Sequence, residues 1–233
     1  AAAWLAERFG GRTVFAGAVA IFTLASVLCA LSPNLAAFVA ARLLQGAAGA
    51  LTVPVGRILV LRNARPAEML DAIATITWPG LIAPVLGPPL GGFITAHAAW
   101  QWVFLINVPI GLTGLVLALA LIPNDRAKAR RPFDLVGFAF SGVGLTLVVY
   151  CLQALSEGRA PWLALGGLVA GVLAGTLAIL RFRNAAHPLI SLAPLKAGTF
   201  LLAVLGAGRV VRIAINATPF LLPLMFQIGW GYD

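Results

Sequence analysis

The sequence predicts an all-α polytopic membrane protein, and three observations support that fold class. Hydrophobic residues make up 61% of the 233 residues, charged residues make up only 10%, and the mean hydropathy is +0.99. Soluble domains carry about 25% charged residues. The apolar residues are also gathered into runs close to the roughly 20 residues that a helix needs to cross a bilayer. We count seven such spans, at residues 14–31, 35–61, 72–96, 102–122, 135–155, 161–181 and 199–226.

Basic residues gather in alternate loops between the spans and account for much of the net charge of +9. The positive-inside rule places these loops in the cytoplasm. They cover residues 1–13, 62–71, 123–134 and 182–198. We therefore expect a multi-pass protein of the cytoplasmic (inner) membrane, with the lipid bilayer as its main partner. No basic helical face interleaved with aromatic residues is present, so we do not expect the chain to bind nucleic acid.

The chain lacks the residue clusters that disulfides, metal centres and enzymes need. Cys29 and Cys151 lie in separate apolar spans without a paired spacing, so neither a disulfide nor a metal site is predicted. No carboxylate pair, histidine cluster or nucleophile with an adjacent base lies within the spans. We expect no catalytic residue, no metal and no enzyme activity. A membrane-embedded enzyme or a structural membrane protein, with its key residues in other helices, is the less favoured alternative.

One apolar stretch, residues 78–92, combines several prolines with small residues at helical spacing. Gly80, Pro84, Gly87 and Gly91 recur at steps of four, three and four, which leaves one helix face nearly free of side chains. Another helix can approach such a face closely. The plainest interpretation is a kinked packing helix in which neighbouring helices satisfy the carbonyl groups that proline leaves unbonded.

Residues 87–92 read Gly-Pro-Pro-Leu-Gly-Gly and resemble the Gly-Pro-x-x-Gly-Gly core of the antiporter signature in major facilitator superfamily exporters. That signature lies in the fifth transmembrane helix of the family. Two flanking positions that usually hold glycine hold Ala74 and Ala83 here, which are also small. The resemblance implies a sliding and sealing surface. Its candidate residues are Gly80, Pro84, Gly87, Pro88, Gly91 and Gly92.

The first residues resemble a second signature of the same superfamily, the loop Gly-x-Leu-Ala-Asp-Arg-x-Gly-Arg-Arg between the second and third helices. Leu5, Arg8, Gly10 and Arg12 match, and Glu7 replaces the usual Asp. The residues alone predict a basic cytoplasmic loop with a tight turn at its two consecutive glycines. The resemblance implies a cytoplasmic-loop gate that steadies the outward-facing state through charge contacts across the two halves. Its candidate residues are Glu7, Arg8, Gly10 and Arg12.

The second span contains an arginine well inside an apolar helix. One helical face carries Arg42, Gln45 or Gly46, Gly49, Val53 and Gly56, which places the guanidinium beside a groove of small residues. An arginine in a span costs about 2.5–3.5 kcal/mol unless it meets water or a partner. Snorkelling of Arg42 to the outer interface is the structural alternative. The stretch also resembles the Arg-x-x-Gln-Gly-x-Gly pattern of the family's fourth helix, where the arginine is linked to proton coupling. We therefore take Arg42 and Gln45 as candidate coupling residues.

Two further stretches resemble exporters with fourteen helices. Residues 100–111 resemble the Trp-Arg-Trp-x-Phe-x-Ile-Asn-x-Pro-x-Gly opening of their sixth helix. The final span resembles their ninth helix, and its Arg209, Arg212 and Asn216 share one face near mid-membrane. These three residues are candidates for substrate or proton contact. An intramembrane pair with an acid elsewhere is the equal alternative.

The resembling stretches occur in the family's order, and they identify the chain as an internal fragment of a fourteen-helix major facilitator drug:proton antiporter. Residues 1–122 would be the N-terminal bundle, from the end of helix 2 to helix 6. Residues 123–198 would be the linking pair, helices 7 and 8, with cytoplasmic loops, and residues 199–233 the first helix of the C-terminal half.

The resemblance implies multidrug efflux, meaning export of small amphipathic or toxic compounds by proton antiport through alternating access. The proton gradient is the expected energy source, without a cofactor. The expected partners are a small-molecule substrate and protons. The complete protein is expected to be a monomer, with periplasmic or outer-membrane partners left open. A major facilitator uniporter or symporter for a metabolite is the alternative function.

All seven acidic residues lie in loops or at span ends. They are Glu7, Glu68, Asp71, Asp125, Asp134, Glu157 and Asp233. A proton antiporter usually needs a titratable carboxylate within the membrane. The resemblance places that acid in the family's first helix, upstream of the stretches matched here, and we expect Arg42 to couple to it.

Overall fold

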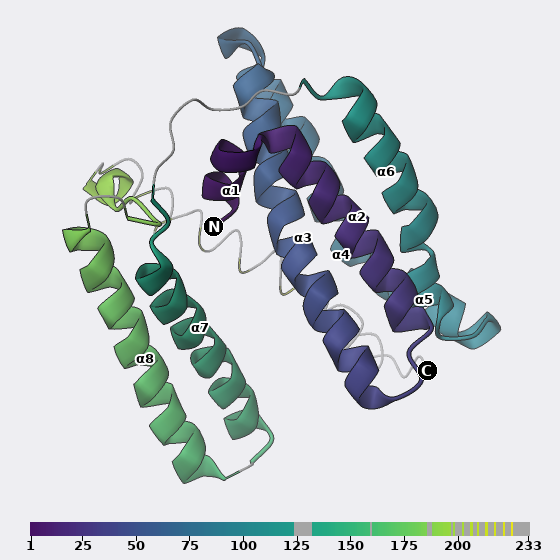
Figure 1. Ribbon diagram of the computed structural model, residues 1–233. Coiled ribbons are helices and arrows are strands. Elements are labelled where there is room, and N and C mark those ends of the chain that lie inside the picture. Colours follow the sequence, from purple (N-terminus) through teal and green to yellow (C-terminus); the bar gives the residue numbers. More distant parts are fainter. Residues whose placement is uncertain are drawn as a thin grey trace. The chain divides into compact units, whose positions relative to one another are not determined.

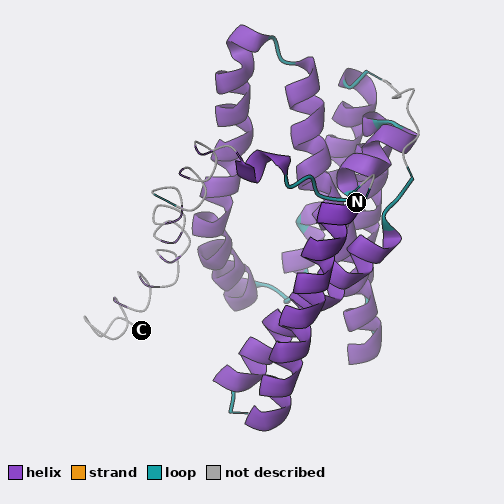
Figure 2. Cartoon of the chain, turned by 90° about the vertical axis from the view of Figure 1, so that its left-hand side faces the viewer, coloured by secondary structure: helices purple, strands orange, loops and turns teal. Residues whose placement is uncertain are grey.

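The computed structural model describes residues 1–123, 132–158, 160–185 and 188–196, together with isolated positions between 198 and 225. In this part of the chain the regular elements are all helical, as Figure 2 shows. The predicted all-α class is therefore confirmed. The main helices are α1 (Ala2–Phe9), α2 (Gly11–Ala30), α3 (Leu35–Asn63), α4 (Met69–His97), α5 (Trp102–Leu105), α6 (Asn107–Leu121), α7 (Leu135–Ser156) and α8 (Pro161–Asn184) (Figure 1). Two short 3₁₀ turns are η1 (Pro66–Glu68) and η2 (Ala193–Lys196).

Six described segments are long and apolar enough to cross a membrane, and they coincide with the first six predicted spans. They are Gly11–Ala30, Leu35–Asn63, Pro66–His97, Trp102–Leu121, Leu135–Ser156 and Pro161–Asn184. The seventh predicted span, 199–226, lies outside the described residues except for isolated positions. The contacts divide the chain into one unit at Ala2–Arg130 and another at Arg131–Asp233, and each is described here by itself.

The structure corrects the prediction of a loop at residues 1–13. α1 covers most of that stretch, because its alanines and Leu5 favour a helix and Ala6 is fully buried. The tight turn is confirmed but is confined to Gly10, whose φ of 91° and ψ of 136° are readily adopted only by glycine. α2 then begins at once, at Gly11.

α2 and α3 pack side by side by placing aromatic rings of one helix over glycines of the other. A Cβ added at Gly56 would lie 3.2 Å from the Phe15 ring, and one added at Gly49 would lie 3.6 Å from the Phe22 ring. The two phenylalanines are seven residues apart on α2, and the two glycines are seven residues apart on α3, which is about two helical turns in each case. Small residues at this interface therefore let the helices approach closely.

The predicted span at 102–122 is interrupted near its start, between α5 and α6, at Ile106. Pro109 is the third residue of α6 and has no N–H to donate to the Leu105 carbonyl, which accounts for the break there. α6 then packs against α2, where Gly111 lies directly opposite Thr23.

α4 remains one continuous helix although it contains Pro79, Pro84, Pro88 and Pro89. None of its residues is buried against the rest of the described chain. Each proline removes one hydrogen bond to the carbonyl four residues earlier. The prediction of a proline-rich helix is confirmed. We also expected another helix to pack on the face of α4 that carries small residues, but no described helix contacts the glycines of that face.

α7 and α8 form a closely packed antiparallel pair. A Cβ added at Gly144 would lie 2.8 Å from the backbone nitrogen of Gly175 and 3.0 Å from the Gly171 carbonyl oxygen. At one end, Asp134 caps α7: its Oδ1 accepts a 3.0 Å hydrogen bond from the Gly137 N–H and lies 3.4 Å from Arg181 Nε of α8.

Candidate functional site: a polar network between two apolar helices

The predicted coupling residues Arg42 and Gln45 are in direct contact. Arg42 Nη1 donates to Gln45 Oε1 over 2.6 Å, and Gln45 Nε2 donates to Ser26 Oγ over 2.6 Å. The Ser26 hydroxyl donates in turn to the Phe22 carbonyl over 2.9 Å. A row of hydrogen bonds therefore runs from the guanidinium on α3 to the backbone of α2.

The centre of this network is shielded from solvent. The exposed fraction is 0% for Ser26 and 3% for Gln45, and the Cys29 sulfur lies 4.0 Å from Gln45 Oε1. A buried amide needs hydrogen-bond partners, because leaving it unpaired costs about 1–3 kcal/mol. Gln45 meets that need on both sides of its amide.

Arg42 lies at the edge of the buried network, next to aromatic rings. Its Cζ lies 5.6 Å from the centre of the Phe104 ring. Phe104 packs edge to face with Phe38 and Trp100, at centroid distances of 5.6 Å and 6.1 Å. Guanidinium groups are attracted to aromatic faces at such distances. A guanidinium has five N–H donors, so the bond to Gln45 occupies only one of them.

The face predicted for α3 is only partly correct. Its buried residues are Ala41, Gln45, Ala48 and Val55. Gln45 therefore faces the core, while Arg42 and Val53 are exposed and flank the buried stripe. Steps of three and four residues drift around a helix that has 3.6 residues per turn, which explains the separation over eleven positions.

The predicted gate residues at the start of the chain contact neighbours within their own unit. Glu7 Oε1 lies 3.8 Å from Arg62 Nη2 at the end of α3. The Arg8 guanidinium lies 5.1 Å from the Trp4 ring centre and 5.8 Å from that of Phe9. Arg12 is half-buried one residue after α2 begins. The contacts expected across the two halves of the transporter stay a prediction.

The antiporter-signature helix presents its glycines to open space. A Cβ added at Gly80, Gly87, Gly91 or Gly92 would meet nothing within 4 Å in the described part of the chain. Of the candidates in the final span, Arg209 is exposed, while Arg212 and Asn216 lie outside the described residues.

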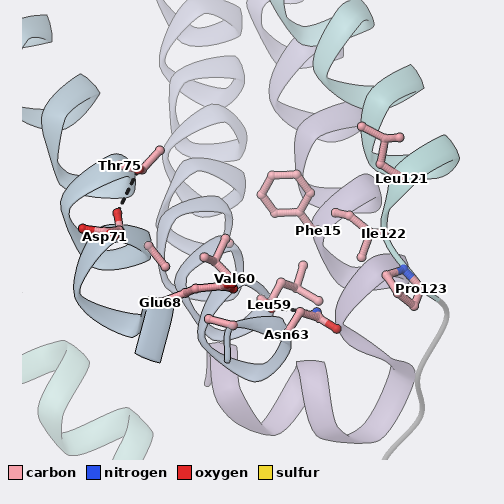
Figure 3. A pocket seen from close by; sticks show the side chains of 13 residues that line it. Phe15, Leu59, Val60, Asn63, Glu68, Asp71, Thr75, Leu121, Ile122 and Pro123 are labelled. Carbon is pink, nitrogen blue, oxygen red and sulfur yellow. Dashed lines mark hydrogen bonds between the residues drawn. The ribbon is translucent and has the colours of Figure 1, made fainter. Parts of the chain in front are cut away.

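A cavity of about 670 Å³ opens between α2, α3, α4 and the end of α6, as seen in Figure 3. Phe15, Leu59, Val60 and Leu121 supply apolar lining, and Glu68 and Asp71 supply two carboxylates. None of the predicted site residues lines it. It lies at the end of the bundle where η1 joins α3 to α4.

Two functional-looking contacts were missed by the sequence reasoning. Ser26 lies in an apolar span with no motif around it, and only its distance of three residues from Cys29 hints at a shared face. Asp134 directly precedes an apolar run, which is a recognised capping signal, but its partner Arg181 is 47 positions away.

The comparisons with known proteins cover the same helical stretch of the chain. The sequence pattern of the Major Facilitator Superfamily matches residues 1–232. The chain belongs to the Major Facilitator Superfamily. It is 42% identical over 237 residues to multidrug resistance protein MdtD of Escherichia coli strain SMS-3-5, and 41% identical over 237 residues to its namesake in Salmonella paratyphi A. A third relative of that name, from Salmonella heidelberg, is 40% identical over 236 residues.

The alignments cover 100% of this chain and 49% of each of these relatives. The chain therefore spans about half the length of the curated relatives it matches. This member of the Major Facilitator Superfamily combines six apolar spans in its described part with a fixed cation beside a buried amide. Such a site can hold an anionic group by the remaining donors of Arg42, or release it when that group takes up a proton.

Proposed function

We propose that this chain is part of a multidrug exporter that exchanges small amphipathic or toxic compounds for protons by alternating access. The contact between Arg42 and Gln45 carries the proposal, because it fixes a permanent charge inside an apolar span. Such charges mark ion and substrate pathways in membrane proteins. The names of the relatives, which refer to multidrug resistance, support the substrate class.

Proton coupling needs an acid that faces Arg42 in one state and is protonated in another. The acidic residues of this chain lie in loops or at helix ends, so we place the acid in the family's first helix. Proton binding to it would break its pairing with Arg42, and substrate binding would do the same, so the two events exclude each other. The halves of the transporter would then rock about the central site.

The proposal also covers location and sidedness. The protein would lie in the cytoplasmic membrane, with the basic loops at residues 1–13, 62–71, 123–134 and 182–198 on the cytoplasmic side. The open glycine face of α4 would seal against another helix during the transport cycle. Arg209, Arg212 and Asn216 would line the cavity from the second half.

The test is ethidium flux in liposomes that contain the full-length transporter, measured with and without an imposed pH gradient. We expect flux in the parent to rise when the pH gradient is imposed. In Arg42→Ala, this gradient-driven increase in flux should be at least ten-fold smaller. Arg65→Ala, which removes an exposed loop arginine with 82% of its side chain accessible, is the matched control and should keep the response.

Flux that ignores the gradient in the parent would contradict proton antiport and favour a uniporter. Flux that rises when protons and substrate move in the same direction would indicate a symporter. An Arg42→Ala protein that melts at the parent temperature and still responds to the gradient would remove Arg42 from the coupling site.

A further inference from the structure

We propose that Ser26 is a positioning residue that fixes the orientation of the Gln45 amide and so holds the Arg42 guanidinium in its working position. This inference rests on the proposed function, since it assigns a residue on a second helix to the same coupling site. It concerns a hydroxyl that belongs to none of the signatures found in the sequence.

The first step is the direction of the hydrogen bonds. A serine hydroxyl has one proton, and Ser26 gives it to the Phe22 carbonyl 2.9 Å away. Its oxygen therefore meets Gln45 with lone pairs only and can bind only a donor. The group of Gln45 that faces Ser26 must be the NH₂, which leaves the carbonyl oxygen pointing the other way.

The second step is that the opposite end of the amide imposes the same orientation. Arg42 has donors and no acceptor, so it can bond only the carbonyl oxygen of Gln45, at 2.6 Å. A flipped amide would place NH₂ against the guanidinium and a carbonyl oxygen against the lone pairs of Ser26. The guanidinium contact would then be donor against donor, and Ser26 could bond the carbonyl oxygen only by giving up its bond to Phe22, so the network has a single polarity.

The third step is burial. Ser26 is 0% exposed and Gln45 is 3% exposed, so no bulk water reaches either group to replace the lost partner. Without the hydroxyl, the Gln45 NH₂ would be a buried donor with nothing to bind, which is strongly unfavourable. We expect the Gln45 side chain to rotate in response and to release Arg42.

The other neighbours of the network cannot replace Ser26. The titratable and charged groups that contact Gln45 are Arg42 on α3 and the thiol of Cys29 on α2, which lies 4.0 Å from the carbonyl side of the amide. α5 contributes the ring of Phe104, which lies against the guanidinium rather than the amide. Only Ser26 contacts the NH₂ side among the described residues.

The test is a double-mutant cycle in the full-length transporter, with ethidium flux in liposomes as the readout. The variants are Ser26→Ala, Gln45→Leu, the double variant, and Ser26→Thr. Ser141→Ala is the matched control, because Ser141 also donates to the carbonyl four residues earlier, at 2.8 Å, but bonds no side chain of a neighbouring helix within the described ranges. The quantity compared is the ratio of flux with a pH gradient to flux without one.

We expect Ser26→Ala to lower that ratio at least three-fold and Ser141→Ala to leave it unchanged. Ser26→Thr keeps the hydroxyl and should restore the ratio, because threonine makes the same backbone bond at Thr23 on this helix. The double variant should be no worse than Gln45→Leu alone, since residues that act through one contact are not additive. Additive losses, or a Ser26→Ala protein that keeps the parent ratio, would overturn the inference.

Failure of the two proposals can be told apart. A parent whose flux ignores the gradient contradicts proton antiport, and the cycle is then evaluated on the maximal flux and the half-saturating ethidium concentration. The same cycle on melting temperature in detergent needs no substrate at all. There, additive losses at residues 26 and 45 would show that the contact itself does not hold the amide.

Discussion

Gly144 of α7 lies so close to the backbone of Gly175 on α8 that α7 has no room for a side chain at this position. A Cβ on Gly144 would lie 2.8 Å from the Gly175 nitrogen and 3.0 Å from the Gly171 carbonyl oxygen. Backbone atoms inside helices cannot move aside as the end of a flexible side chain can. Glycine at this position is therefore a requirement of the interface between α7 and α8.

The first prediction concerns this interface. Gly144→Ala should destabilise the α7–α8 pair by about 1–3 kcal/mol, the usual cost of overfilling a packed site. Gly142→Ala is the control on the same helix, because a Cβ there would meet no described atom within 4 Å. Thermal unfolding of the full-length protein in detergent measures both. Equal melting temperatures for the two variants would show that the helices can separate without cost.

The second prediction concerns pH and the cap of α7. The hydrogen bond from the Gly137 N–H, together with Arg181, holds the pKa of Asp134 below its usual value. Because the pKa is lower in the folded state, the stabilisation is present at neutral pH and is lost as pH falls through the folded pKa. Asp134→Ala should cost about 1 kcal/mol at neutral pH from the lost cap.

The difference in melting temperature between the parent and Asp134→Ala should therefore shrink in acid. Asn34→Ala is the matched control, since Asn34 caps α3 through a 2.8 Å bond from the Ala37 N–H but carries no charge. Its cost should be independent of pH. If the loss of melting temperature in Asp134→Ala is also the same at every pH, the Asp134 cap is not ionised.

The third prediction separates a gate from a stabilising contact at Glu7 and Arg62. Their side chains are 34% and 46% exposed at a distance of 3.8 Å, so we expect the pair to add less than about 1 kcal/mol to stability. Glu7→Arg should barely change the melting temperature but should lower ethidium flux several-fold. The swap Glu7→Arg with Arg62→Glu should recover part of the flux. Unchanged flux in Glu7→Arg would remove this residue from the gate.

The fourth prediction tests the open face of α4. Gly87→Leu should lower flux at least ten-fold in the full-length transporter, because the proposed sealing surface must accept a closely approaching helix. Gly142→Leu, on a face of α7 where no described atom lies within 4 Å of an added Cβ, should keep its flux. Normal flux in Gly87→Leu would show that nothing packs tightly on this face during the cycle.

The sequence predicts the helices well, because a bilayer imposes a minimum length and an apolar composition on each of them. Six described segments match six predicted spans. The error at residues 1–13 arose because charge and paired glycines suggest a loop, whereas the structure needs only Gly10 for the turn. Short helices at loop positions leave no hydropathy signal.

The site was only partly predictable from the sequence. Arg42 and Gln45 are three residues apart, so helical geometry alone brings them together. Ser26 joins them across a helix–helix contact, and no pattern in the sequence indicates which residue on α2 faces Gln45. The same applies to Arg62, which meets Glu7, and to Arg181, which meets Asp134, since neither pair shares a helix.

The close fit of α7 to α8 has a consequence for how such transporters are made and how they diversify. The two helices complete each other through glycine contacts, so they can pack together as a hairpin without another helix between them. Gain or loss of that hairpin in a gene then changes the number of membrane crossings by two. An even change keeps every later loop on its original side of the membrane, so ancestral proteins could acquire or discard the pair without inverting the downstream helices.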